Sequence, residues 1–151
     1  PLVLGEREAT DEVAGPLLEH YWSPLPQLRL GERLRGLATS ALDISDGLLA
    51  DCGHIAKASG VALHLQVDSL PMSQALRGFL GLEGARHAAL TGGDDYVLAF
   101  TLPGAELPGL LAAGWPIHVV GRVEVGSGVS LYDREGRNIT PAVRGYQHFS
   151  D

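Results

Sequence analysis

Apolar residues recur at helical spacing most clearly in the segment between Ser45 and Gly60. One stripe of this segment consists of Leu48, Leu49, Cys52, Ile55, Ala56 and Ser59. The polar residues Asp51, His54 and Lys57 fall on the other faces. Glycine directly after the last periodic residue favours the end of a helix. The pattern therefore predicts an amphipathic helix that Gly60 terminates.

Weaker helical patterns occur on both sides of this segment. Helices are expected from Thr10 onward and over residues 31–37, 73–80, 83–90 and 105–113. Pro16 interrupts the first pattern, because proline has no backbone N–H and fits the first turn of a helix or a break rather than its interior. Gly114 is expected to end the last helix.

Runs rich in β-branched and aromatic residues predict the strands. They cover residues 61–67, 96–101, 117–125 and 129–132, and residues 96–101 have the composition of a buried strand. The sequence Gly126-Ser127-Gly128 predicts a hairpin between the last two strands. The order of helices and strands indicates an α+β fold, a layered α/β sandwich with a mixed sheet, in which residues 1–151 form a single domain.

Charge and composition narrow the class of protein. The chain has 151 residues, 45% of them hydrophobic, and 18 acidic residues against 11 basic ones, so its net charge is −7. An acidic surface argues against nucleic acid or an anionic membrane as a partner. No apolar run approaches the ~20 residues of a membrane span, and a cytoplasmic location is expected. Cys52, the single cysteine, excludes an intramolecular disulfide and is expected in the core.

The first candidate site is the sequence Asp43-Ile44-Ser45-Asp46-Gly47, just ahead of the predicted amphipathic helix. Carboxylates are the ligands that Mg²⁺ prefers, and a helix N-terminus favours an anion, so the two features together predict a metal–phosphate site. The alternative is that Ser45 or Asp43 caps the helix and Asp46 complements its dipole. The spacing alone leaves both open.

The second candidate is the glycine pair and acidic pair Gly92-Gly93-Asp94-Asp95, followed by Tyr96 at the start of a predicted strand. Paired glycines allow the backbone to approach another backbone or a ligand closely, although glycine and aspartate are also common in ordinary turns. The six histidines show no paired spacing typical of metal ligands, so they are expected at the surface or in packing.

Together these segments resemble the second domain of thiamine-monophosphate kinase, a family with the aminoimidazole ribonucleotide synthetase-like fold. The similarity is carried by Asp43–Asp51 (DISDGLLAD), by Gly92–Tyr96 (GGDDY) and by the aromatic closing segment Gly145–Phe149 (GYQHF), in the family's order. Asp94 departs from the family, which usually has glutamate there.

The resemblance implies ATP-dependent transfer of a phosphoryl group to thiamine monophosphate, with Mg²⁺. Asp43 and Asp46 would be Mg²⁺ ligands, Ser45 would contact the nucleotide phosphates, and Asp94 and Tyr146 would contact the substrate. No residue is assigned as a catalytic base, because in-line transfer needs positioning and charge neutralisation rather than a covalent residue.

The resemblance implies an N-terminal ATP- and Mg²⁺-binding domain that is expected to be absent from this chain. The resemblance therefore implies half of an active site, which folds alone and does not turn over, within a full-length protein that forms a homodimer. The alternative is a stand-alone, non-catalytic domain of the same fold that binds a phosphorylated metabolite or serves as a scaffold.

Overall fold

The computed structural model describes residues 11–141, with side chains from residue 15 onward, so Tyr146 and its aromatic segment lie outside the described residues. The helices are α1 (Asp11–Trp22), α2 (Leu28–Leu34), α3 (Leu48–Ser59), α4 (Gln74–Thr91) and α5 (Leu107–Ala112). The strands are β1 (Ser40–Asp43), β2 (Ala62–Gln66), β3 (Leu98–Thr101), β4 (Gly121–Glu124) and β5 (Gly128–Tyr132). Within residues 11–141, no helix has both the length and the apolar character needed to cross a lipid bilayer.

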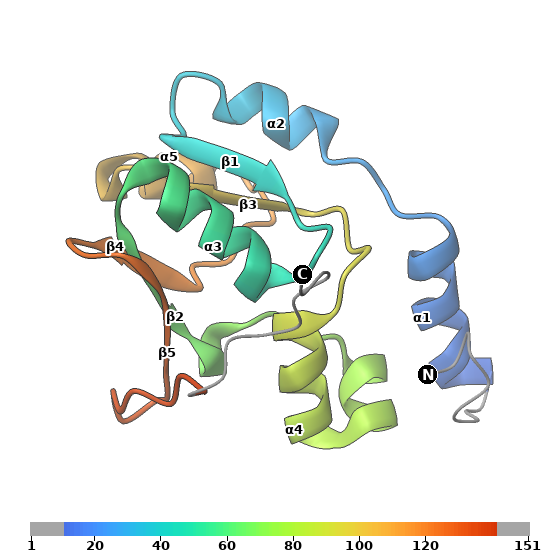
Figure 1. Ribbon diagram of the computed structural model, residues 1–151. Helices are drawn as coiled ribbons and strands as arrows, with labels where there is room; N and C mark the ends of the chain where they lie inside the picture. The colour runs from blue at the N-terminus through green and yellow to red at the C-terminus, as the bar shows by residue number, and fades with distance from the viewer. Residues whose placement is uncertain (1–10, 142–151) are drawn as a thin grey trace, which may run out of the picture.

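The strands form two small sheets, and the mixture of helices and sheets confirms the predicted α+β class (Figure 1). Strands β1 and β3 pair antiparallel, with Ser40 opposite Thr101 and Asp43 opposite Leu98. The second sheet has the order β4-β2-β5, in which β2 is antiparallel to β4 and parallel to β5. This second sheet is the mixed sheet that the sequence predicted.

The hairpin predicted at Gly126–Gly128 is wrong. Strands β4 and β5 lie on opposite sides of β2, and Ala62 pairs with Glu124 on one side and with Gly128 on the other. The short connection therefore passes over the end of β2, where a Cβ on Gly126 would lie 3.2 Å from the Ala62 side chain. A short connection with two glycines can form either a hairpin or a link across a third strand, so the local sequence alone did not distinguish the two topologies.

Helix α3 joins the two sheets, because it contacts β1 and β3 of the first sheet and β2 and β5 of the second (Figure 1). The larger hydrophobic core is made of Ile44, Leu48, Cys52, Ile55, Ala56, Leu63, Leu65, Val67, Leu70 and Leu131. Most of the predicted apolar stripe therefore lies in the core, and Gly60 ends the helix with φ of 65° as expected. Ser59 is exposed, and Asp51, which was expected on a polar face, is buried.

A second, smaller core covers the first sheet. Leu30 and Leu34 from α2 and Leu110 from α5 are buried there, and half-buried Leu98 and Phe100 of β3 pack against them. Strand β3 is therefore half-buried along its length, less than the composition of residues 96–101 suggested.

Three helix predictions change in the structure. Helix α1 continues through Pro16, so the expected break is absent, and α2 begins earlier and ends three residues before the predicted end at residue 37. The two predicted helices at 73–80 and 83–90 are the halves of α4, which are separated by a kink at Gly81 (φ 71°, ψ 175°). Strand β1 was not predicted, since its four residues acquire a partner only 55 positions or more along the chain.

Burial raises the pKa of the Cys52 thiol to about 11, with a smaller contribution from the neighbouring charge of Asp51. Because the thiolate is the reactive form, Cys52 is expected to resist labelling by a disulfide reagent at pH 8 in the folded protein. Labelling should become fast and stoichiometric once urea unfolds the chain. Rapid labelling without denaturant would show that the core around α3 is open.

Candidate functional site

Helix α3 begins without a side-chain cap, since Gly47 occupies the N-cap position and no side chain bonds to the free amides of the first turn. A carboxylate inside the helix bonds to the preceding loop instead. Oδ2 of Asp51 accepts hydrogen bonds from the backbone N–H of Ser45 at 2.9 Å and of Asp46 at 3.0 Å. The alternative that Ser45 or Asp43 caps this helix is therefore wrong.

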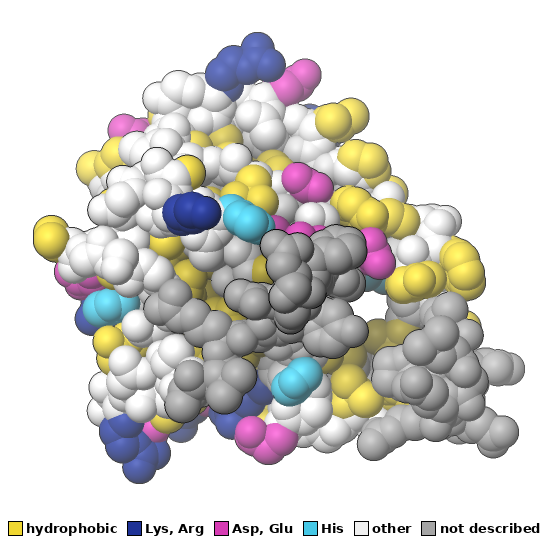
Figure 2. All heavy atoms as spheres, viewed as in Figure 1, with side chains coloured by type: hydrophobic (Ala, Val, Ile, Leu, Met, Phe, Trp, Pro, Cys, Tyr) yellow, Lys and Arg dark blue, Asp and Glu magenta, His cyan; other side chains and the backbone are white. Residues whose placement is uncertain are grey.

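Asp51 is 2% exposed, yet it lines an open pocket of about 420 Å³ between β1 and α3. The residues around this pocket are Ser40, Ala41, Leu42, Ser45, Asp46, Asp51, His54, Ile55, Ala58 and Ser59. Acidic side chains gather near the middle of this face of the molecule, where β1 ends and α3 begins (Figure 2). The pocket therefore combines apolar walls with a concentration of negative charge.

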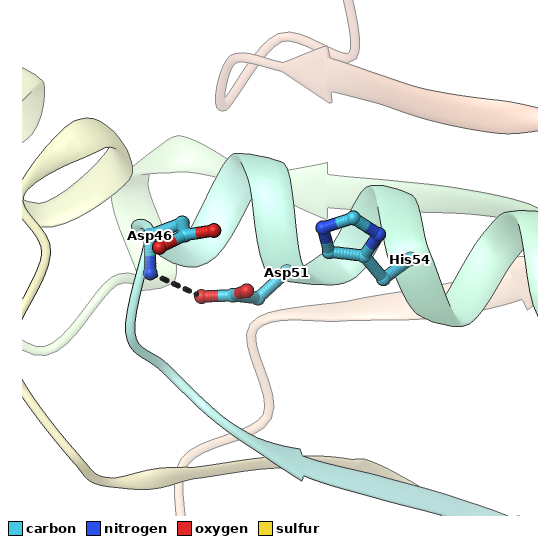
Figure 3. Close-up of side chains that lie close together, drawn as sticks. All are labelled: Asp46, Asp51 and His54. Carbon is cyan, nitrogen blue, oxygen red and sulfur yellow. Dashed lines mark hydrogen bonds between the residues drawn. The ribbon is translucent and has the colours of Figure 1, made fainter. Parts of the chain in front are cut away.

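Asp46, Asp51 and His54 each offer one potential metal-ligand atom, and these atoms lie within 4.8 Å of one another (Figure 3). Asp46 and His54 are exposed, whereas Asp51 is buried beneath them. The sequence pattern predicted no metal role for the histidines and no site role for Asp51. The available signal was the spacing of Asp51 and His54, because residues three apart lie on the same face of a helix.

The two sequence motifs meet through their backbones. The N–H of Asp94 donates to the Ser45 carbonyl at 2.9 Å and the N–H of Tyr96 donates to the Ile44 carbonyl at 2.9 Å. The N–H of Ile44 donates in return to the Val97 carbonyl at 2.9 Å. These bonds continue the β1–β3 pairing beyond the strands, so the two acidic segments form one structural unit.

Two glycines allow the loop before α3 to lie against the segment at the end of α4 and the start of the second motif. A Cβ on Gly93 would overlap the carbonyl oxygen of Ser45, and a Cβ on Gly47, which has φ of 103°, would lie 2.9 to 3.1 Å from the backbone of Thr91. The expectation that the glycine pair allows close backbone contact is therefore confirmed for Gly93, whose partner is the first motif.

Backbone strain is concentrated in the second motif. Asp94 has φ of 62° and Tyr96 has φ of 53°, in the left-handed region that an aromatic residue seldom adopts. The Tyr96 hydroxyl donates to Oδ1 of Asp94 at 3.0 Å. Residues held in such conformations occur where the surrounding structure requires them, as the paired backbone does here.

The predicted site residues fall into two neighbouring groups. Ser45 and Asp46 line the pocket. Asp43, at the exposed end of β1, is outside the Asp46 group, and its charge contributes to the raised pKa of Tyr96. Asp94 is exposed beside Tyr96.

Helix α1 reaches the second motif through a side-chain hydrogen bond that the sequence did not indicate. Nε2 of His20 lies 2.6 Å from Oδ1 of Asp95, and both side chains are about half exposed. The two residues are 75 positions apart, so neither helical nor strand spacing could have indicated the contact. Asp95 is therefore engaged with α1, whereas its neighbour Asp94 is bonded to Tyr96.

Replacing Gly93 with alanine is expected to lower the free energy of unfolding by about 1–3 kcal/mol, because the new Cβ cannot fit against the Ser45 carbonyl. Gly53→Ala is the matched control, since its Cβ would meet nothing within 4 Å and alanine favours the interior of a helix by ~1 kcal/mol. Urea unfolding of both variants measures the difference. Equal stability of the two variants would contradict the close backbone contact.

The hydrogen bond to Asp94, followed by the charge of the same carboxylate, raises the pKa of Tyr96 above its usual value of 10.0. Asp94→Asn should lower that pKa toward the ordinary value, because the negative charge that opposes ionisation is removed. NMR titration with ring-labelled tyrosine resolves Tyr96 from the other tyrosines. An unchanged Tyr96 titration would show that the two side chains are not in contact in solution.

Curated proteins similar to this chain are thiamine-monophosphate kinases. The chain is 37% identical to thiamine-monophosphate kinase of Salmonella typhimurium over 95% of its own length and 45% of the relative's. It is 38% identical to that of Escherichia coli K12 over 89% of its own length and 42% of the relative's. No protein-family model matches the chain.

Solved structures of thiamine-monophosphate kinases also superpose on this chain. The thiamine-monophosphate kinase of Stenotrophomonas maltophilia K279a superposes with a TM-score of 0.76 at 42% identity, over 83% of this chain and 41% of the other. A structure described as AaThiL complexed with AMPPCP and TMP superposes with a TM-score of 0.80 at 31% identity, over 98% of this chain and 46% of the other.

A more distant match concerns the fold alone: Escherichia coli HypE, a hydrogenase maturation protein, is 22% identical with a TM-score of 0.63. The chain thus has the aminoimidazole ribonucleotide synthetase-like fold that the resemblance implied, and it spans a little under half the length of the curated relatives it matches. By sequence and by structure, this chain is a homologue of the thiamine-monophosphate kinases.

Proposed function

We propose that the chain is the C-terminal portion of a thiamine-monophosphate kinase, which transfers the γ-phosphoryl group of ATP to thiamine monophosphate and yields thiamine diphosphate. The observation that carries the proposal is the junction of the two motifs. The Ser45 carbonyl accepts a hydrogen bond from the Asp94 N–H. This bond holds the exposed Asp94 next to the loop whose Ser45 and Asp46 line the pocket. A phosphoryl transfer needs such proximity between phosphate and acceptor.

The donor atoms of the first motif fit Mg²⁺. Asp43 and Asp46 both present exposed carboxylates, and Mg²⁺ is usually held by one or two carboxylates together with phosphate oxygens and water. When bound, Mg²⁺ would neutralise charge on the phosphates. His54 is less suited to Mg²⁺ than to softer ions, so the two exposed carboxylates are the proposed ligands.

The remaining residues take positioning roles in the proposal. The Ser45 hydroxyl, at the edge of the pocket, would donate to a nucleotide phosphate. Asp94 would contact thiamine monophosphate through the carboxylate oxygen that Tyr96 does not occupy, with a reach one methylene shorter than the family's glutamate. Tyr146, in the aromatic segment outside the described residues, would pack against the thiamine rings.

The proposal requires a second half of the active site. The chain spans 41–46% of the two curated relatives and of the first two solved structures named above. We propose that an N-terminal domain binding ATP and Mg²⁺ precedes it in the full-length protein. That domain would supply the missing ligands for nucleotide and metal. The chain alone is then inactive, and the homodimer and the cytoplasmic location remain predictions.

The test is a phosphoryl-transfer assay with ATP, Mg²⁺ and thiamine monophosphate, carried out on residues 1–151 and on a longer protein that includes the upstream half. Activity is expected in the longer protein alone. Within it, Asp46→Asn should reduce kcat at least ~100-fold, the scale of losing one preorganised charged group.

Glu135→Gln is the matched control, because it makes the same change from carboxylate to amide at an exposed position beyond β5 and should leave the rate unchanged. Activity in neither protein would favour the alternative of a non-catalytic domain that binds a phosphorylated metabolite. Full activity of Asp46→Asn would overturn the assignment of Asp46.

A further inference from the structure

Asp51 is the one buried charged residue among those that the structure describes, at 2% exposed. Burying a carboxylate is costly unless hydrogen bonds compensate it. Here the compensation comes from two consecutive backbone amides, those of Ser45 and Asp46, which both donate to Oδ2. Figure 3 shows the bond from Asp46. The buried carboxylate therefore stabilises the backbone of the loop before α3, and its burial adds no stability to the hydrophobic core around it.

Ser45 and Asp46 lie directly before Gly47, the N-cap residue of α3. The free N–H groups at and before a helix N-terminus, together with the helix dipole, commonly bind phosphate. In this protein the carboxylate of Asp51 already takes the N–H groups of Ser45 and Asp46, and it adds a negative charge where a phosphate would have to lie. The loop cannot bind a bare phosphate through these amides.

Resting on the proposed function, we infer that Asp51 is a positioning residue. Its carboxylate holds the backbone of Ser45 and Asp46 so that the Ser45 hydroxyl and the Asp46 carboxylate lie at the pocket. The alternative is that Asp51 is itself a metal ligand, because its carboxylate lies within 4.8 Å of the potential ligand atoms of Asp46 and His54.

Two substitutions separate these roles. Asp51→Asn keeps one oxygen that can accept both N–H groups but removes the charge, whereas Asp51→Ala removes the acceptor. A positioning role requires the acceptor, and a ligand role requires the charged oxygen. Asp51→Asn is nearly isosteric, so it remains informative if Asp51→Ala fails to fold.

The first measurement is amide hydrogen exchange on residues 1–151, which does not depend on kinase activity. Exchange at Ile55, in the core-facing part of α3, serves as the internal reference for global opening. Relative to Ile55, Asp51→Ala should accelerate exchange at Ser45 and Asp46 by about 10- to 100-fold, and Asp51→Asn should accelerate it much less. Unchanged relative exchange in Asp51→Ala would overturn the inference.

The second measurement is the Mg²⁺ dependence of kcat in the longer protein. Asp51→Asn should keep the Mg²⁺ concentration for half-maximal rate near the wild-type value, with kcat within about tenfold, while Asp46→Asn raises that concentration. An increase in Asp51→Asn as large as in Asp46→Asn would show that Asp51 is a ligand and overturn the positioning role. If the wild-type protein has no kinase activity, the proposed function fails and the exchange result still decides the role of Asp51.

Discussion

The loop that precedes α3 is bonded on both of its sides, and the rest of the site depends on that arrangement. Its N–H groups at Ser45 and Asp46 point toward the buried carboxylate of Asp51, and its carbonyls at Ile44 and Ser45 accept the N–H groups of the second motif. A loop that uses its donors on one side and its acceptors on the other has little freedom to move. Side chains carried on such a loop keep a defined position relative to both α3 and the second motif.

Charge bears on why the proposed function places part of the site outside this chain. The acidic residues of both motifs lie on a chain whose net charge is already −7, so phosphate groups would be repelled from it unless cations intervene. The relatives are about twice as long, and in the proposed function the upstream half provides the additional metal and nucleotide contacts. In that proposal the described residues hold cations and orient the acceptor, and the upstream half contributes to nucleotide binding.

The fold illustrates which parts of a structure local sequence can predict. The amphipathic stripe and Gly60 were enough for α3, because helix packing and termination are decided by residues within four positions of one another. The pairing of β1 with β3 was not predicted. Strands β4 and β5 were wrongly predicted to form a hairpin, whereas β2 lies between them. Those features depend on contacts between residues far apart in the chain, which short-range patterns do not encode.

The site divides in the same way. Sequence by itself determined the family resemblance and the two acidic motifs, since these depend on residue identity and close spacing. That position 93 needs a glycine follows from the contact with the Ser45 carbonyl, which only the folded chain makes. Tertiary structure alone decided that Asp51 is buried, that His54 joins Asp46, and that His20 pairs with Asp95. The physical reason is that burial and pairing are properties of the packed chain: a carboxylate on the polar side of an isolated helix becomes an interior acceptor only when a loop folds over it.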